Sequence, residues 1–168
     1  GQLTFHIMVD KEFKKTAALI FQGSCAQIGI NIVLEEMETA ALKGKLNDAS
    51  LDYELALYQF TDDLGTDYTL RNQHGSTVQA DGTLKKNGSN RCNMKDATFN
   101  AMLDEALVET DSAKREQDYH EIENYLDEIC PLVPICTSYI NIGAKKGIVG
   151  AIWKPDAKHD FRYIALAD

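Results

Sequence analysis

Residues 3–37 read LTFHIMVDKEFKKTAALIFQGSCAQIGINIVLEEM, and this stretch decides the fold. It opens with an apolar, β-rich run, Leu3–Val9, and closes with a second, alternating run, Ile30–Met37. Between them, apolar or small side chains recur at spacings of three and four, which indicates one face of an amphipathic helix. That predicted face consists of Phe13, Ala17, Ile20, Phe21, Ser24 and Ile28. With Asp10 as its N-cap and Gly29 just past its end, the segment predicts strand, helix and parallel strand.

Predicted helices and strands also occur along the rest of the chain, so an α/β fold with a mixed central sheet flanked by helices is expected. The further predicted elements are a helix over Thr39–Asp48, a strand over Tyr53–Phe60, helices capped by Asp96 and Ser112, and a buried strand or two over Leu132–Ile142. Residues 61–95 show no sustained period and exceed the roughly 15 residues usual for a structureless loop. We expect this segment to be functional or to take its order from a neighbour.

Composition excludes some classes of protein. The 168 residues suit one domain, and 44% apolar residues can build a core. A net charge of −9 disfavours nucleic acid and anionic membranes as partners. No apolar run approaches the roughly 18 residues of a membrane span. The chain starts within a strand, without an initiator Met or secretory signal, so we expect it to be cut from a longer protein.

The cysteines and histidines do not form a recognisable metal site. None of the cysteines forms the close pair of a zinc or thioredoxin motif. A bridge between Cys130 and Cys136 stays possible, but four free and mostly buried thiols are favoured. Asp62, Asp63 and Asp67 lack the spacing of a calcium loop. The sequence therefore predicts no metal and no cofactor. The cysteines are Cys25, Cys92, Cys130 and Cys136, and the scattered histidines are His6, His74, His120 and His159.

Four segments in series resemble the dipeptide, oligopeptide and nickel-binding family of ABC-transporter solute-binding proteins. They are Phe21–Met37, Tyr53–Phe60, Asp96–Ala106 and the stretch from Arg115 through Ile135. The resemblance covers only the C-terminal lobe of that family, a periplasmic-binding-protein-like lobe. It implies that residues 1–146 are a ligand-binding lobe. Residues 147–168 would then be its tail, running back toward the hinge and the absent N-terminal lobe.

The resemblance also implies a function. Family members enclose a ligand between two lobes that close about a hinge. This chain would then be part of the solute-binding component of an ABC importer, which captures a small peptide-like ligand and delivers it to the permease subunits. The resemblance implies an extracytoplasmic location and attachment to the membrane through a lipoprotein anchor of the parent protein. It implies no enzymatic activity.

The candidate ligand-binding residues follow from the same resemblance. Peptide-binding members have a turn after the third strand that reads Trp-x-Ala-Asp-Tyr, whose Asp pairs with the ligand amine. Here Phe60 stands at the Trp, Thr61 at the variable position, Asp62 at the Ala and Asp63 at the Asp. Taken alone, both aspartates fit solvated turn residues. The resemblance favours Asp63 as the amine anchor, because an enclosed ammonium needs a charged partner.

Two other classes of function stay open at this stage. The lobe could belong to a ligand-sensing regulatory protein, because one fold hosts many functions. A hydrolase using Asp62 and Asp63 is disfavoured, because adjacent residues of an extended chain point to opposite faces. The nickel branch has an Arg-centred turn that this sequence lacks. For a lobe taken from a larger protein we also expect an exposed apolar face.

Overall fold

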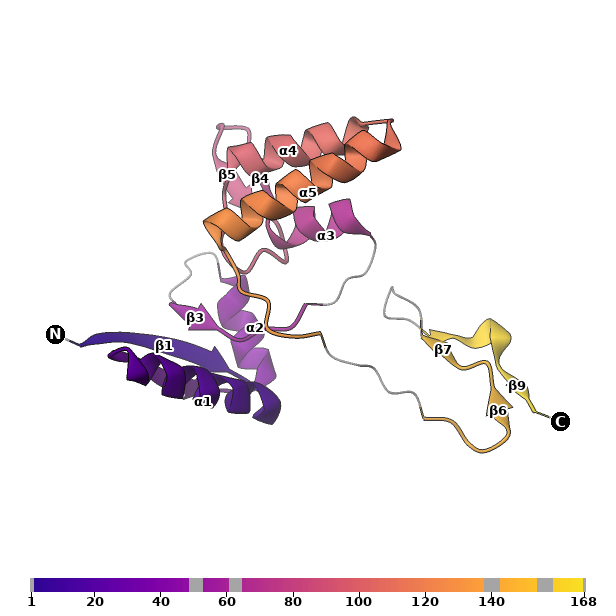
Figure 1. Ribbon diagram of the computed structural model, residues 1–168, viewed down its shortest axis with the longest axis horizontal. Coiled ribbons are helices and arrows are strands. Elements are labelled where there is room, and N and C mark those ends of the chain that lie inside the picture. Colours follow the sequence, from indigo (N-terminus) through magenta and orange to yellow (C-terminus); the bar gives the residue numbers. More distant parts are fainter. Residues whose placement is uncertain (1, 49–52, 61–64, 138–142, 154–158, 168) are drawn as a thin grey trace. The chain divides into compact units, whose positions relative to one another are not determined.

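The computed structural model describes residues 2–48, 53–60, 65–137, 143–153 and 159–167 (Figure 1). It divides into two compact units, Gly1–Phe60 and Thr61–Asp168. The elements of the first unit are β1 (Leu3–Val9), α1 (Glu12–Gln27), β2 (Ile30–Glu36), α2 (Thr39–Asn47) and β3 (Leu55–Ala56). Those of the second unit are α3 (Thr66–Gln73), β4 (Ser76–Val78), β5 (Leu84–Lys86), α4 (Ala97–Val108), α5 (Ser112–Ile129), β6 (Ile148–Val149), β7 (Ile152–Trp153), β8 (His159–Asp160), a short 3₁₀ helix (Phe161–Tyr163) and β9 (Ala165–Leu166).

The first unit is built on a sheet with strand order β2-β1-β3. β1 pairs parallel with β2, where Leu3 lies opposite Ile30, and parallel with β3, where Ile7 lies opposite Leu55. The predicted strand, helix and parallel strand are thus confirmed. The described central sheet is parallel, whereas a mixed sheet was expected. It is parallel because a helix connects each strand to the next and returns the chain to the end of the sheet where the previous strand began. The predicted strand Tyr53–Phe60 is paired only at Leu55–Ala56.

Helices cover both faces of this sheet. Successive strand residues point to opposite faces, so Ile7 and Val9 pack in a cluster with Ala18 and Cys25 of α1. Met8 joins Leu42 and Leu46 of α2 in a separate cluster. This alternation extends past β3, because Leu55 and Leu57 pack on the first cluster while Ala56 and Tyr58 pack on the second. The α/β fold class is therefore as the sequence predicted.

The buried face of α1 differs from the prediction. Lys14, Ala18 and Cys25 face inward, at spacings of four and seven. Ala18 and Cys25 are small, so the helix can lie close to the strands. The large apolar residues of the predicted face are exposed instead: Phe13 (58%), Ile20 (67%), Phe21 (44%) and Ile28 (74%). Gly29 ends the helix at a φ of 81°, as expected for a C′ glycine.

The helices predicted for the second unit are present. Asp96 caps α4, because its carboxylate accepts the backbone N–H groups of Thr98 and Phe99 at 2.8 and 3.1 Å. Asp111 caps α5 in place of the predicted Ser112, accepting the N–H of Lys114 at 2.9 Å. Apolar side chains of the two helices meet in one core that contains Phe99, Leu103, Ala106 and Ile122, all fully buried.

Residues 65–95, the described part of the segment without a sequence period, are more ordered than their composition suggested. They contain α3 and an antiparallel hairpin of β4 and β5. Much of this order comes from the buried side chain of Asn90, whose Nδ2 donates to the carbonyls of His74 and Gly75 at 3.0 Å and of Met94 at 2.7 Å. Its Oδ1 accepts the N–H of Met94 at 3.1 Å. A polar side chain thus holds this segment together, and a search for periodic apolar residues does not detect such a contact.

The segment after α5 departs from the prediction of a buried strand. Residues 132–137 form no strand, and Val133 and Ile135 are 72% and 64% exposed. Pro131 and Pro134 lack the N–H group that a sheet ladder needs. Residues 138–142 lie outside the described part. In the tail, β6 pairs with β9 and β7 with β8, and Phe161 and Leu166 are exposed, in keeping with an exposed apolar surface.

The cysteines are free thiols, as favoured from the sequence. The expectation that most are buried is wrong, because only Cys25 is buried. Cys92 is half-buried, and both Cys130 and Cys136 are exposed without a bridge. Burial raises the pKa of the Cys92 thiol, although Lys86 acts in the opposite direction.

His74 gives the second unit a predicted sensitivity to acid. Its side chain is buried, its Nδ1 has no hydrogen-bond partner, and burial lowers its pKa below 6.5. The unfolded chain takes up a proton near pH 6.5 and the folded unit does not, so stability is complete above that pH and declines as pH falls toward the folded pKa.

Urea unfolding of the second unit at about pH 7 and about pH 5 measures this effect. We expect a lower midpoint at the acidic pH and a smaller change in His74→Leu. An equal change in both proteins would show that His74 is not the group responsible.

Candidate functional site

The carboxyl ends of the parallel strands define the candidate site in the first unit. β1 leads into Asp10, β2 leads into Met37, and β3 leads into the segment Leu57–Phe60. Parallel strands end at the same edge, so these connections share one edge of the sheet. The N–H of Met37 donates to Val9 and that of Leu57 to Met8, which holds the connections beside β1.

The strand order places a topological switch point at this edge. From β1 the chain passes through α1 to β2 on one side, and then through α2 to β3 on the other side. Open α/β sheets bind ligands at the carboxyl ends of their strands, where successive connections run in opposite directions along the sheet. Asp10 and the segment through Phe60 emerge at these ends of β1 and β3.

Asp10 and Lys14 form a buried ion pair at this point. Lys14 Nζ lies 2.6 Å from Asp10 Oδ1, and the two side chains are 7% and 2% exposed. Burial alone would raise the pKa of Asp10, but hydrogen bonds from Lys14 and Thr39 and the positive charge of Lys14 hold that pKa below its usual value. Asp10 was expected to cap α1. The N-cap position falls on Lys11, and Asp10 instead links β1 to α1 and α2.

Two aromatic side chains, Tyr58 and Phe60, connect this ion pair to the start of the predicted ligand turn. Lys14 Nζ lies 5.7 Å from the centroid of the Tyr58 ring. The Tyr58 ring meets the Phe60 ring edge-on, with centroids 5.3 Å apart and planes at 76°. Phe60, the predicted aromatic wall, is half-buried. Thr61, Asp62 and Asp63 lie outside the described residues, so their roles stay predictions.

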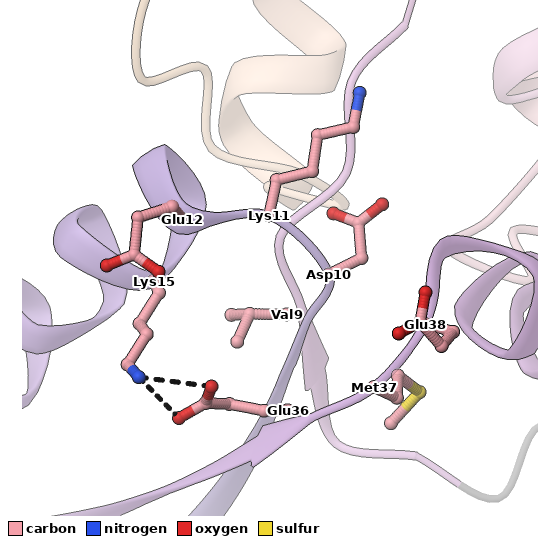
Figure 2. Close-up of a pocket in the computed structure, with 8 residues that line it drawn as sticks. All are labelled: Val9, Asp10, Lys11, Glu12, Lys15, Glu36, Met37 and Glu38. Carbon is pink, nitrogen blue, oxygen red and sulfur yellow. Dashed lines mark hydrogen bonds and ion pairs between the residues drawn. The ribbon is translucent and has the colours of Figure 1, made fainter.

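A polar pocket of about 430 Å³ opens beside the ends of β1 and β2 (Figure 2). Its charged lining is mainly acidic. Across it, Lys15 Nζ contacts both carboxylate oxygens of Glu36, at 2.9 and 3.1 Å. The lining residues are Val9, Asp10, Lys11, Glu12, Lys15, Glu36, Met37 and Glu38.

Sequence reasoning named Phe60, whose role as a ligand wall stays a prediction, and did not name Asp10, Lys14 or Tyr58 as parts of this edge. The available signal was an aspartate directly after a buried strand with a lysine four residues later. No group of three or more His, Cys, Asp or Glu side chains suited to a metal ion occurs in the described ranges. Nor is any described helix both long and apolar enough to span a bilayer.

Comparison with known proteins gives matches only among solved structures. No protein-family model and no curated protein sequence matches the chain. HbpA2 from Haemophilus parasuis matches 98% of this chain with a TM-score of 0.73 and 22% identity. DppA from Helicobacter pylori, an ABC transporter-associated periplasmic binding protein in complex with the peptide STSA, matches 77% with a TM-score of 0.61 and 22% identity. NikA from Staphylococcus aureus, in complex with Ni(L-His)2, matches 92% with a TM-score of 0.64 and 16% identity.

These matches establish the fold. The chain corresponds to 32%, 24% and 32% of the length of the three proteins. It therefore has the fold of one part of the solute-binding proteins that serve peptides and nickel, as the resemblance of its sequence implied. Among these three structures, that of DppA holds a peptide and that of NikA holds a nickel complex.

Proposed function

We propose that this chain is the C-terminal lobe of a solute-binding protein of an ABC importer, and that it supplies one wall of a cleft for a small peptide-like ligand. The observation that carries the proposal is the strand order β2-β1-β3, which reverses the direction of successive connections at the carboxyl ends of the strands. Open α/β sheets bind ligands at such a point, and the fold is shared with a peptide-binding protein. Capture between two lobes needs no covalent chemistry, so the lobe acts by binding and not as an enzyme.

The turn that follows Phe60 supplies the ligand contacts in this proposal. The Phe60 ring forms an aromatic wall, Asp63 pairs with the amino group of the ligand, and Thr61 and Asp62 flank it. The position of Phe60, at the carboxyl end of β3 and against Tyr58, supports the assignment of its ring to this wall. A peptide-like ligand is favoured over a nickel complex because the sequence lacks the Arg-centred turn of the nickel branch.

The remaining partners follow from the same proposal. The lobe closes against an N-terminal lobe of the parent protein, and the closed protein delivers its ligand to the permease subunits of the importer. Residues 1–146 form the binding lobe, and residues 147–168 run back toward the hinge. The parent protein acts outside the cytoplasm and is held at the membrane by a lipoprotein anchor.

Replacing Asp63 tests the assignment of the amine anchor. In the intact polypeptide that carries this lobe, Asp63→Ala is expected to weaken peptide binding at least tenfold, or about 1.4 kcal/mol, because an enclosed ammonium loses its charged partner. Equilibrium dialysis against a defined mixture of di- to pentapeptides, quantified by mass spectrometry, measures the loss.

Asp127→Ala serves as the matched control, because Asp127 is an exposed carboxylate on α5. This variant should bind as the unaltered protein does. Retention of the same peptides with unchanged affinity by Asp63→Ala would remove Asp63 from the site.

A further inference from the structure

Lys14 has surroundings unlike those of the neighbouring lysine on the same helix. Lys15 forms an ion pair with Glu36 in which the side chains are 33% and 57% exposed. The pair of Lys14 with Asp10 is almost fully enclosed, at 7% and 2%. Moving two charges out of water is unfavourable, and their mutual attraction offsets that loss only while both partners are present. The burial of the Lys14–Asp10 pair therefore indicates a role beyond that of a surface charge.

The second contact of Lys14 indicates what that role is. Its ammonium lies within reach of the face of Tyr58, where a cation and a ring attract each other. The ring of Tyr58 in turn contacts that of Phe60. A continuous series of contacts thus runs from Asp10 at the end of β1, through α1, to the residue that precedes the predicted ligand turn. It joins the carboxyl end of β1 to the carboxyl end of β3.

We propose that Lys14, held by Asp10, is a positioning residue for the ligand-binding wall. Its ammonium fixes the ring of Tyr58, and Tyr58 fixes the ring of Phe60 at the carboxyl end of β3. A wall that is already ordered reduces the entropy lost when a ligand binds. The ligand-binding part of this inference rests on the proposed function, whereas the ordering of the two rings does not.

The first experiment needs no ligand. Ring signals of Tyr58 and Phe60 are measured by NMR on the whole chain with labelled aromatic residues. Asp10→Asn combined with Lys14→Met removes both charges, so that neither is left buried alone. We expect shifted ring signals and faster ring flipping in this double variant. Lys14→Arg, which keeps a cation, should restore the signals.

Lys45→Met is the matched control for the lost ammonium. Lys45 lies on α2, is exposed and pairs loosely with Glu35 at 3.8 Å. Its replacement should leave both rings unchanged. If the double variant also leaves them unchanged, the positioning role of Lys14 is wrong.

The second experiment measures peptide binding by the intact polypeptide in the dialysis assay described above. We expect the double variant to bind about threefold to tenfold more weakly, from the loss of a cation–ring contact. In a Phe60→Leu background the same change should cost much less, because the two residues act through one contact series.

The outcomes separate the two proposals. Unchanged affinity in the double variant, alongside weakened binding by Asp63→Ala, would overturn the role of Lys14 in ligand binding and leave the proposed function standing. If the unaltered protein binds no peptide, the proposed function fails, and the ring signals alone decide whether Lys14 positions Tyr58 and Phe60.

Discussion

Asp10→Ala is expected to destabilise the first unit by about 3–5 kcal/mol, because it leaves the ammonium of Lys14 buried without its partner. The same change removes an acceptor for Thr39 at the start of α2. The loss of stability is measured by urea unfolding, with hydrogen exchange in peptides from β1 and α1 as the readout for this unit.

A second variant shows whether the unpaired ammonium of Lys14 causes the loss of stability in Asp10→Ala. Asp10→Ala combined with Lys14→Met removes both charges and should recover a large part of the stability, because replacing a buried pair by apolar groups is often close to neutral. A loss below about 1 kcal/mol in Asp10→Ala, which is ordinary for a surface position, would contradict the buried pair.

The second large effect is expected in the second unit. Asn90→Ala should destabilise it by about 3–4 kcal/mol, because a buried group left without its hydrogen-bond partner costs about 1–3 kcal/mol. The carbonyls of His74 and Met94 and the N–H of Met94 lose their contacts with this side chain. Hydrogen exchange in α3 and in the β4–β5 hairpin reports the change.

Asn90→Asp separates hydrogen bonding from side-chain volume. It keeps the shape of the side chain but replaces the donating NH₂ group by an acceptor that faces three carbonyl oxygens, so we expect at least an equal loss. Asn124→Ala on α5, at an exposed position, is the control and should change stability by less than about 0.5 kcal/mol. A mild effect of both Asn90 variants would mean that other contacts hold this segment.

Local patterns predicted much of the fold. The order β1, α1, β2, α2 and β3 follows from strand and helix periods, and the cap at Asp96 follows from a side chain that can accept N–H groups. The parallel pairing follows from helices that connect the strands. These features depend on residues close in sequence, which is why one sequence can predict them.

The features that were missed depend on contacts between distant residues. α1 turns small residues and Lys14 toward the sheet and exposes Phe13 and Ile20, which no helical period can foresee. Residues 74–94 take much of their order from the hydrogen bonds of Asn90, which a search for apolar repeats does not detect. At the candidate site, resemblance to a family pointed to Phe60, whose role stays a prediction. The contact of Lys14 with Tyr58 joins residues 44 positions apart and could be recognised only from the fold.

The most direct test of the proposed function is mass spectrometry of the intact polypeptide, purified without unfolding, for a ligand that it carries. We expect an added mass that corresponds to a small peptide and is lost on unfolding. The fraction of protein that carries this mass should be lower in Asp63→Ala. A protein recovered only at its own mass, with no affinity for the di- to pentapeptide mixture, would contradict it.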